Sequence, residues 1–291
     1  MHSLSYRSYG KVNLYLDVLD RRADGFTNIE TVLQSIDLWD RVLVERSGSE
    51  IALTCSDTQL GAGPDNLVYR AAALVRARAH IRSGVSLHLE KNIPVAAGLA
   101  GGSGNAAATL VALNALWEIG WDTTKLRELA LELGSDVPFC VVGGTVAATG
   151  RGELLEVFRP IGTHWLVLVH PQLSVTAGHA YGHPKLTRNR SVPVEGMTPE
   201  FRKVLKRLVQ GEPEQMIFNR MESGVFHDHP KLAEIKALLV QLGCLASAMS
   251  GSGPTVFGLC EDEAFAREVS SRIAGYRTSV VSTVPYGVLR E

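Results

Sequence analysis

The first sixty residues alternate between apolar and polar side chains, which is the pattern of β-strands. In residues 9–18 one face carries valine and leucine, while the other carries Tyr9, Lys11, Asn13 and Tyr15. The segment 20–25 ends in Asp-Gly and predicts a turn. Residues 29–46 and 50–55 are rich in β-branched and aliphatic side chains and are predicted to continue the same sheet.

A helical period replaces this alternation after residue 65. Residues 65–83 are predicted to form a helix that Asp65 caps and that Gly84 ends. A turn is expected at 134–139, between two further helices and a strand. The remaining elements expected in this half are strands at 85–90 and 145–149 and helices at 103–117 and 123–133.

The second half of the chain mixes strands and helices. Residues 165–170 form a continuous apolar run, which predicts a buried strand. Helical patterns follow near 198–210, 213–226 and 230–242, and the chain ends in a strand, a helix and a strand. Strands grouped at the start with helices interspersed later predict an α+β fold. We expect two lobes, residues 1–160 and 161–291.

Composition excludes several classes of function. The 291 residues are 45% hydrophobic and carry a net charge of −1, so nothing indicates a nucleic-acid partner or an acidic membrane. The four cysteines are far apart and form no CxxC pair, which is typical of free thiols in a reducing compartment. No run of 18 apolar residues occurs. We therefore expect a cytoplasmic, soluble protein. As a separate expectation, we take it to be a monomer or weak dimer.

A glycine-rich segment follows the expected strand at 85–90 and leads directly into a helix. Glycines let the backbone approach a ligand closely, and the unpaired N–H groups of a helix N-terminus suit phosphate. A plain strand-to-helix connection is the alternative. The segment comprises Pro94, Val95, Ala96, Ala97, Gly98, Leu99, Ala100, Gly101, Gly102, Ser103, Gly104 and Asn105.

Two common phosphate loops do not explain this segment. A Walker A loop requires Gly-Lys-Ser/Thr, which is absent. Gly102, Gly104 and Ala107 fit G-x-G-x-x-A, but Asp122 begins a helical segment, whereas the acid of a dinucleotide-binding fold ends a strand. Because alanine is strained at positive φ, the alanines of the segment are expected to adopt ordinary backbone angles.

Lys11 and Asp136 are candidates for a reactive pair. Lys11 lies in mid-strand on the same face as Asn13, about 7 Å away along the strand. It faces either water or a site. Asp136 precedes Val-Pro and is either a helix N-cap or an acceptor for the proton of an alcohol. The glycine-rich string 250–257 is either a tight turn or a loop that closes on substrate.

The histidines do not form a recognisable metal motif. His179 and His183 are four residues apart, but residue 180 is alanine, so no HExxH is present. Pro184 also disfavours a helix at His183. We expect no metal held by the protein itself.

The chain resembles the GHMP kinase superfamily. The strings that carry the resemblance cover nearly the whole chain and lie at residues 8–14, 22–26, 94–105, 134–139, 148–153 and 250–257. Within the superfamily they are similar to the branch that phosphorylates 4-diphosphocytidyl-2-C-methyl-D-erythritol. The resemblance implies a two-lobed α+β fold with an N-terminal ATP lobe, a C-terminal substrate lobe and a cleft between them.

The resemblance also implies an activity and a set of residues. The activity is ATP-dependent phosphorylation of the 2-hydroxyl of that cytidine diphosphate sugar alcohol, a step of the non-mevalonate isoprenoid pathway, with Mg²⁺ bound with ATP. Lys11 and Asp136 match the catalytic pair, and the segment 94–105 matches the ATP loop. The residues expected to bind the substrate are Asn13, Phe26, Thr27 and Tyr181, with the two aromatic rings on either side of cytosine.

Thr27 departs from the pattern of this branch, which usually has histidine at that position. The departure leaves open a GHMP kinase that acts on a different alcohol. A nucleotide-binding homologue without catalysis is a third possibility, although the chain retains both Lys11 and Asp136.

Overall fold

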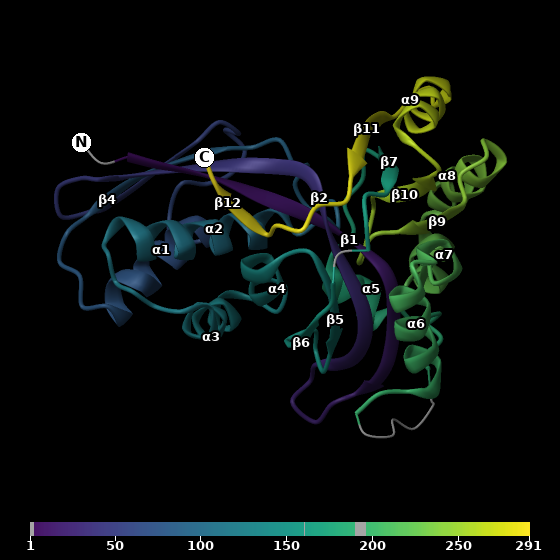
Figure 1. Ribbon diagram of the computed structural model, residues 1–291, viewed down its shortest axis with the longest axis horizontal. Helices are drawn as coiled ribbons and strands as arrows, with labels where there is room; N and C mark the ends of the chain where they lie inside the picture. The colour runs from purple at the N-terminus through teal and green to yellow at the C-terminus, as the bar shows by residue number, and fades with distance from the viewer. Residues whose placement is uncertain (1–2, 160, 190–195) are drawn as a thin grey trace.

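The computed structural model describes residues 3–159, 161–189 and 196–291. In these ranges the chain forms two sheets with helices packed against them (Figure 1). The strands are β1 (Ser3–Arg21), β2 (Thr27–Arg46), β3 (Ile51–Cys55), β4 (Val85–Glu90), β5 (Thr145–Thr149), β6 (Leu154–Val157), β7 (Trp165–His170), β8 (Phe218–Asn219), β9 (Ala246–Met249), β10 (Val256–Cys260), β11 (Arg277–Ser282) and β12 (Val288–Arg290). The helices are α1 (Leu67–Arg78), α2 (Gly101–Leu116), α3 (Thr123–Leu133), α4 (Val137–Val142), α5 (Ala177–Gly182), α6 (Pro199–Gln210), α7 (Glu222–Asp228), α8 (Pro230–Gln241) and α9 (Glu263–Arg272), with a 3₁₀ turn at Pro213–Gln215.

The first sheet is mixed and is built around the long strands β1 and β2. Its order is β12-β1-β2-β4-β3; β5 pairs with β2 and β6, and β8 pairs with β1. The β3–β4 and β1–β8 pairs are parallel, and the others are antiparallel. Helices α1–α4 gather along one side of this sheet (Figure 1). Their alanine and leucine side chains share one apolar core with β2 and β4.

The second sheet is antiparallel, in the order β11-β7-β10-β9. Helix α8 packs against β9 and β10, and α9 packs against β7 and β11. The α+β prediction is confirmed. The expected boundary at 160/161 involves residue 160, which lies outside the described residues, and it stays a prediction. The last strand returns to the first sheet, where Val288 pairs with Ser8.

An apolar cluster connects the two sheets. Val12 and Leu14 of β1 lie in one cluster with Leu166 of β7 and Phe257 of β10, all almost fully buried. Each such side chain contributes about 1.5–3 kcal/mol on burial. The β1–β2 register shifts between Asn13 and Tyr15. The strict alternation predicted for residues 9–18 is therefore wrong at this bulge, which brings Tyr15 into the same cluster as Leu14.

Several predicted elements have the predicted bounds, and three elements need correction. The first is the helix predicted at 65–83. Asn66, rather than Asp65, caps α1 by accepting the N–H of Val68 at 2.9 Å. That helix ends at Arg78 because His80 adopts a positive φ of 54°, so Gly84 is not its cap. The second corrected element is the turn expected at 134–139, because its last residues already belong to α4.

The third correction concerns the predicted helix at 213–226. The segment is interrupted by β8, whose pairing with β1 overrides the helical pattern. Arg220 N–H donates to the carbonyl of Leu16 at 2.8 Å, so the backbone here is bound to the first sheet.

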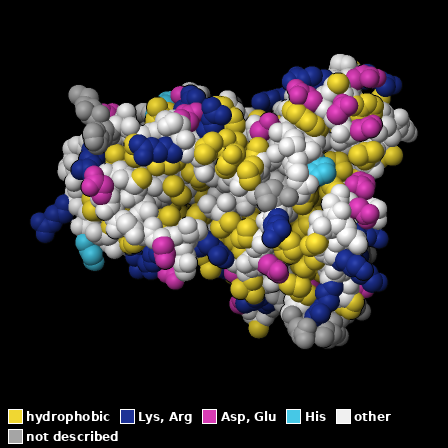
Figure 2. All heavy atoms as spheres, in the orientation of Figure 1, with side chains coloured by type: hydrophobic (Ala, Val, Ile, Leu, Met, Phe, Trp, Pro, Cys, Tyr) yellow, Lys and Arg dark blue, Asp and Glu magenta, His cyan; other side chains and the backbone are white. Residues whose placement is uncertain are grey.

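Among the described residues, none of the helices combines the length and the apolar character that a transmembrane span requires. The face seen in Figure 2 mixes Lys and Arg side chains with Asp and Glu side chains.

His170, at the end of β7, makes the stability of the fold depend on pH. Its ring nitrogens bond the hydroxyls of Thr255 and Ser279 at 3.2 and 3.1 Å. Burial, followed by the nearby charge of Arg277, lowers the pKa of His170 from 6.5 to about 4. As the pH falls, the histidine of the unfolded chain is protonated near pH 6.5, whereas His170 in the folded protein stays neutral until about pH 4. The contribution of this residue to stability is therefore fully present above pH 6.5 and is lost as the pH drops toward 4. The expected loss is about 3 kcal/mol in the free energy of unfolding.

Urea unfolding at several pH values measures this loss. In a His170→Gln variant, whose side chain can still hydrogen bond both hydroxyls, the decrease between pH 6.5 and 4 should be clearly smaller. The same decrease in both proteins would show that other groups cause it.

Candidate active site

Three segments that are distant in sequence meet at the side chain of Lys11. The Lys11 ammonium donates to the side-chain oxygen of Asn13 at 2.6 Å and to the carbonyl of Gly98 at 2.8 Å. The Ser250 hydroxyl donates to the same Gly98 carbonyl at 3.0 Å. A Cβ on Gly251 would lie 3.0 Å from the Lys11 nitrogen. Lys11 therefore faces a site, where β1, the glycine-rich segment and the 250–257 turn converge.

A cavity of about 670 Å³ opens from this point. Asp136 lines it together with Lys11, although the two residues come from opposite ends of the first lobe's sequence. Figure 1 shows how this occurs, since α4 lies close to β1 and β5. All the residues expected to act on or bind the substrate line this one cavity: Lys11, Asp136, Asn13, Phe26, Thr27 and Tyr181.

A second cavity, of about 400 Å³, adjoins the glycine-rich segment. All residues from Pro94 to Asn105 line it except Leu99 and Gly104. Leu99 is buried in the core, and its carbonyl accepts the backbone N–H of Lys11, while Gly104 packs against Ser8. Gly98, Ala100 and Ser103 line both cavities. The segment is thus a shared wall between two spaces large enough for small molecules.

The backbone angles of the glycine-rich segment differ from those predicted for its alanines. Ala96 and Ala100 adopt positive φ angles of 52° and 56°, not ordinary ones. Each alanine in that region costs roughly 1–2 kcal/mol. Ala100 occupies the N-cap position of α2, and no side chain caps that helix. The residues that begin this helix, Gly101, Gly102 and Ser103, line the second cavity, and uncapped N–H groups at a helix N-terminus suit an anion.

Burial and the carboxylate of Asp136 both shift the pKa values of two other side chains in the first cavity. Burial lowers the pKa of the Lys11 ammonium, and the carboxylate of Asp136 is the main opposing influence. The same carboxylate adds to the effect of burial in raising the pKa of the Tyr181 phenol. Asp136 is therefore close enough to both side chains to act on their charge.

Asp136 stands at the N-cap position of α4, but its side chain makes no capping hydrogen bond. The structural alternative, a carboxylate that serves as a helix cap, is therefore not realised. The backbone of Asp136 begins the helix, and its carboxylate is left to face the cavity.

The sequence did not single out Lys91 and Asp40. They form a buried ion pair below the glycine-rich segment, and Asp40 also accepts the backbone N–H groups of Asn92 and Ile93 at 2.7 and 2.8 Å. Lys91 lines the second cavity. This carboxylate fixes the chain that leads into the segment. An acid in mid-strand with a lysine fifty residues later gives no local signal of such a pair.

Asn219 and Glu222 also escaped prediction. Asn219 is buried and donates to the carbonyls of Met249 and Gly251 at 2.7 and 2.8 Å. Glu222 accepts the N–H of Met249 at 2.8 Å and pairs with Lys236. Two side chains from the β8–α7 region thus hold the 250–257 turn against Lys11.

His179 and His183 meet at one carboxylate, that of Asp228, at 2.9 and 3.0 Å. Their ligand atoms lie close enough to suggest a metal site. The backbone N–H of Lys185, however, donates to Nδ1 of His183, so the ring proton lies on Nε2 and points at Asp228. The group fits a hydrogen-bonded clamp between α5, which carries Tyr181, and α7.

Gly98 is a point of close contact between the glycine-rich segment and the 250–257 turn. It has φ +75°, and an added Cβ would lie 2.2 Å from the carbonyl of Ser250. A Gly98→Ala variant should separate the two segments and lower turnover with ATP by about 100-fold, since small misplacements of reacting groups have such effects. Steady-state kinetics measures this loss.

Gly275 provides the control for strain alone. Its φ is +81°, and an added Cβ would meet nothing within 4 Å. Gly275→Ala should reduce stability but retain turnover. Equal turnover in both variants would contradict the close contact at Gly98.

Comparison with known proteins supports the picture of a two-lobed kinase. The family model of the GHMP kinases N terminal domain matches residues 66–144, and that of the GHMP kinases C terminal matches residues 201–276. The 4-diphosphocytidyl-2-C-methyl-D-erythritol kinase of Pelotomaculum thermopropionicum is 43% identical over 263 residues, which are 90% of this chain and 91% of that protein. The Brevibacillus brevis protein of the same name is 38% identical over 94% of this chain and 93% of its own length.

A solved structure agrees. The crystal structure of a 4-(cytidine 5'-diphospho)-2C-methyl-D-erythritol kinase superposes with a TM-score of 0.81 at 34% identity. The match covers 96% of this chain and 98% of that one.

Proposed function

Because this chain belongs to the GHMP kinases, and within them to the family of the 4-diphosphocytidyl-2-C-methyl-D-erythritol kinases, we propose that it transfers the γ-phosphoryl group of ATP to the 2-hydroxyl of that cytidine diphosphate sugar alcohol. The observation that carries the proposal is the wall shared by the two cavities. Lys11 and Asp136 line the first cavity, and the residues at the uncapped N-terminus of α2 line the second.

The second cavity would take ATP. The free N–H groups at the start of α2 would bind its phosphates. Ser103 lines both cavities, so its hydroxyl would be available to the transferred phosphate. Ser103, the ATP phosphates and water would together hold Mg²⁺, which neutralises phosphate charge when it is bound. Asp65 also lines this cavity and adds a carboxylate to its wall.

The first cavity would take the acceptor. Phe26 and Tyr181 would stack on the cytosine ring from opposite sides, and Asn13 would bind near the reacting hydroxyl. Asp136 would orient this hydroxyl and accept its proton. As the oxygen of the acceptor forms its bond to the γ-phosphorus, the bond between this phosphorus and ADP breaks. The Lys11 ammonium would stabilise the negative charge on the transferring group.

A coupled assay of ADP release tests the proposal. The protein, Mg-ATP and 4-diphosphocytidyl-2-C-methyl-D-erythritol should give turnover, and a phosphorylated product should appear by mass spectrometry. Mevalonate and homoserine serve as alternative acceptors. Turnover with either of them, and none with the cytidyl substrate, would assign the chain a different alcohol.

The protein is further proposed to be a cytoplasmic monomer or weak dimer. Sedimentation at micromolar concentration would test the oligomeric state.

A further inference from the structure

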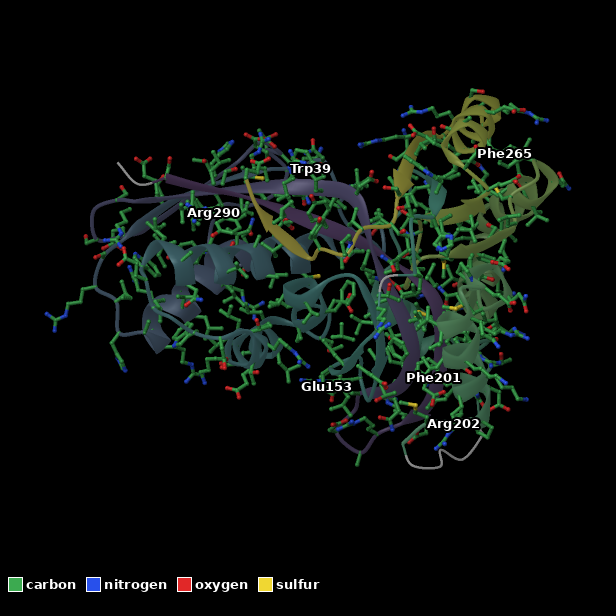
Figure 3. All side chains as sticks on the ribbon, viewed as in Figure 1. Trp39, Glu153, Phe201, Arg202, Phe265 and Arg290 are labelled. Carbon is green, nitrogen blue, oxygen red and sulfur yellow. The ribbon has the colours of Figure 1, made fainter. Side chains whose placement is uncertain are left out.

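Ser8 and Asn105 form a buried hydrogen bond between β1 and the beginning of α2. The two elements pack against each other close to β12, whose Arg290 is labelled in Figure 3. The exposed fraction of Ser8 is 0% and that of Asn105 is 2%. The Ser8 hydroxyl donates to the side-chain oxygen of Asn105 at 2.9 Å. A Cβ on Gly104 would lie 2.7 Å from this hydroxyl oxygen, so glycine at that position makes room for the contact.

The hydrogen bond fixes which end of the Asn105 amide faces β1. In the part of the chain that the structure describes, the Ser8 hydroxyl has no acceptor besides this amide oxygen. If the amide turned over, its nitrogen would face the hydroxyl, and the buried O–H of Ser8 would lose its acceptor. A buried donor without an acceptor is unfavourable. The oxygen of the amide is therefore held on Ser8, and the nitrogen is held at the other end of the side chain.

The amide nitrogen of Asn105 has no acceptor among the described residues. Within those residues, the unpaired side-chain nitrogens that are fully enclosed by protein belong to Trp117 and Arg127, so the Asn105 nitrogen borders open space. Asn105 lines the second cavity, as does Gly101, which lies four residues earlier on the same face of α2. Because helical side chains lean toward the N-terminus of their helix, this nitrogen lies on the side of the uncapped first turn.

A second hydrogen bond of the same kind provides an internal comparison. Thr145 of β5 donates its hydroxyl to the side-chain oxygen of Gln34 of β2 at 2.6 Å, and both residues are buried. The nitrogen of Gln34 donates to the carbonyls of Ser35 and Val284 at 2.9 and 3.1 Å. Neither Thr145 nor Gln34 lines the two cavities. The protein itself satisfies that amide, whereas the amide held by Ser8 keeps a donor for a ligand.

We propose that Ser8 is a positioning residue for ATP, which holds the amide of Asn105 so that its nitrogen donates to a phosphate oxygen in the second cavity. This inference rests on the proposed function. Phosphate oxygens are negatively charged acceptors, and the N–H groups at the start of α2 would bind the same group. A reversed amide would present its oxygen to the phosphate and repel it. The hydroxyl of Ser8 thus selects the orientation that binds.

Calorimetric titration with Mg-ATP tests the assignment without turnover. Ser8→Ala should raise the Kd for ATP about three- to tenfold, the usual effect of one hydrogen bond, because the amide can then reverse. Asn105→Ala should raise it about tenfold or more, since a donor to a charged group is lost. The two effects should not add. The double variant should have the Kd of Asn105→Ala alone, because Ser8 acts only through that amide.

Asn105→Asp distinguishes a positioned donor from a mere link between β1 and α2. One carboxylate oxygen can still accept the Ser8 hydroxyl, so the link is kept. The other oxygen would bring a negative charge to the phosphates, and at pH 8 the Kd for ATP should rise more than in Asn105→Ala. If the aspartate variant binds ATP as the wild type does, the pair is only structural and the assignment is overturned. Additive effects of Ser8→Ala and Asn105→Ala would overturn it as well.

Thr145→Val is the matched control, because it removes the hydroxyl of the comparison pair and keeps the shape of the side chain. It should lower the Tm and leave the Kd for ATP unchanged. An equal rise of the Kd in Thr145→Val and Ser8→Ala would mean that lost stability alone weakens ATP binding, which would contradict the role of Ser8.

The wild type separates this inference from the proposed function. If it binds ATP and turns over the cytidyl substrate while Ser8→Ala leaves the Kd for ATP unchanged, only the inference about Ser8 fails. If the wild type binds no ATP, the proposed function fails and the inference fails with it.

Discussion

An Asp136→Ala variant is expected to lower kcat by roughly 10²- to 10⁴-fold, the usual contribution of a positioned general base. The carboxylate lines the acceptor cavity and makes no cap to α4, so its removal should affect the chemical step rather than the fold. The Kd for ATP should change by no more than about twofold, because the second cavity does not include Asp136. ADP release gives kcat, and calorimetry gives the Kd for ATP.

Asp136→Asn distinguishes two roles for the same side chain. The amide oxygen can still accept a hydrogen bond from the acceptor hydroxyl, but it cannot take the proton. If orientation dominates, as a loose phosphoryl-transfer transition state permits, the asparagine variant should retain clearly more activity than the alanine variant. If proton removal dominates, the two variants should be equally slow.

A structural role for Asp136 would give a different result. Loss of a helix cap costs about 1 kcal/mol of unfolding free energy. A stability loss of this size in Asp136→Ala, with equal losses of ATP binding and turnover, would contradict the catalytic assignment.

The sequence predicted those parts of the fold that local patterns encode. The strand 165–170 is a continuous apolar run, and the helix 123–133 follows Asp122, which caps it by accepting the N–H of Lys125 at 2.8 Å. The structure gives both at the predicted bounds. The helix predicted at 213–226 was wrong because pairing of β8 with β1 is a tertiary interaction that no local period reports.

The sequence predicted the separate segments of the site, but it did not predict how they come together in space. Nothing between Lys11 and Asp136 in the sequence fixes their distance, which depends on how α4 packs beside β1. The positive φ angles of Ala96 and Ala100 were missed because alanine normally avoids that region. The surrounding contacts, such as Thr255 N–H to the carbonyl of Ala97, impose the loop's path regardless of this local preference.

Replacing Lys11 by methionine should lower kcat by roughly 10²- to 10³-fold, the effect of removing one preorganised group that stabilises charge in the transition state. Methionine has a similar length and no charge. In this variant the hydroxyl of Ser250 can still donate to the carbonyl of Gly98, so the glycine-rich segment between the two cavities should keep its position. Steady-state kinetics with ATP and the cytidyl substrate measures the loss, and circular dichroism checks the fold.

The pH dependence of the wild type provides a second readout for Lys11. Burial lowers the pKa of its ammonium, so the charged form that catalysis requires is lost at a lower pH than for an exposed lysine. As the pH rises through this lowered pKa, kcat should fall, and the residual activity of Lys11→Met should lack that alkaline decline. Because a buried ammonium opposes folding at neutral pH, the methionine variant should be no less stable than the wild type. A variant that unfolds more easily and keeps the alkaline decline would mean that Lys11 holds the fold together and that another group supplies the charge.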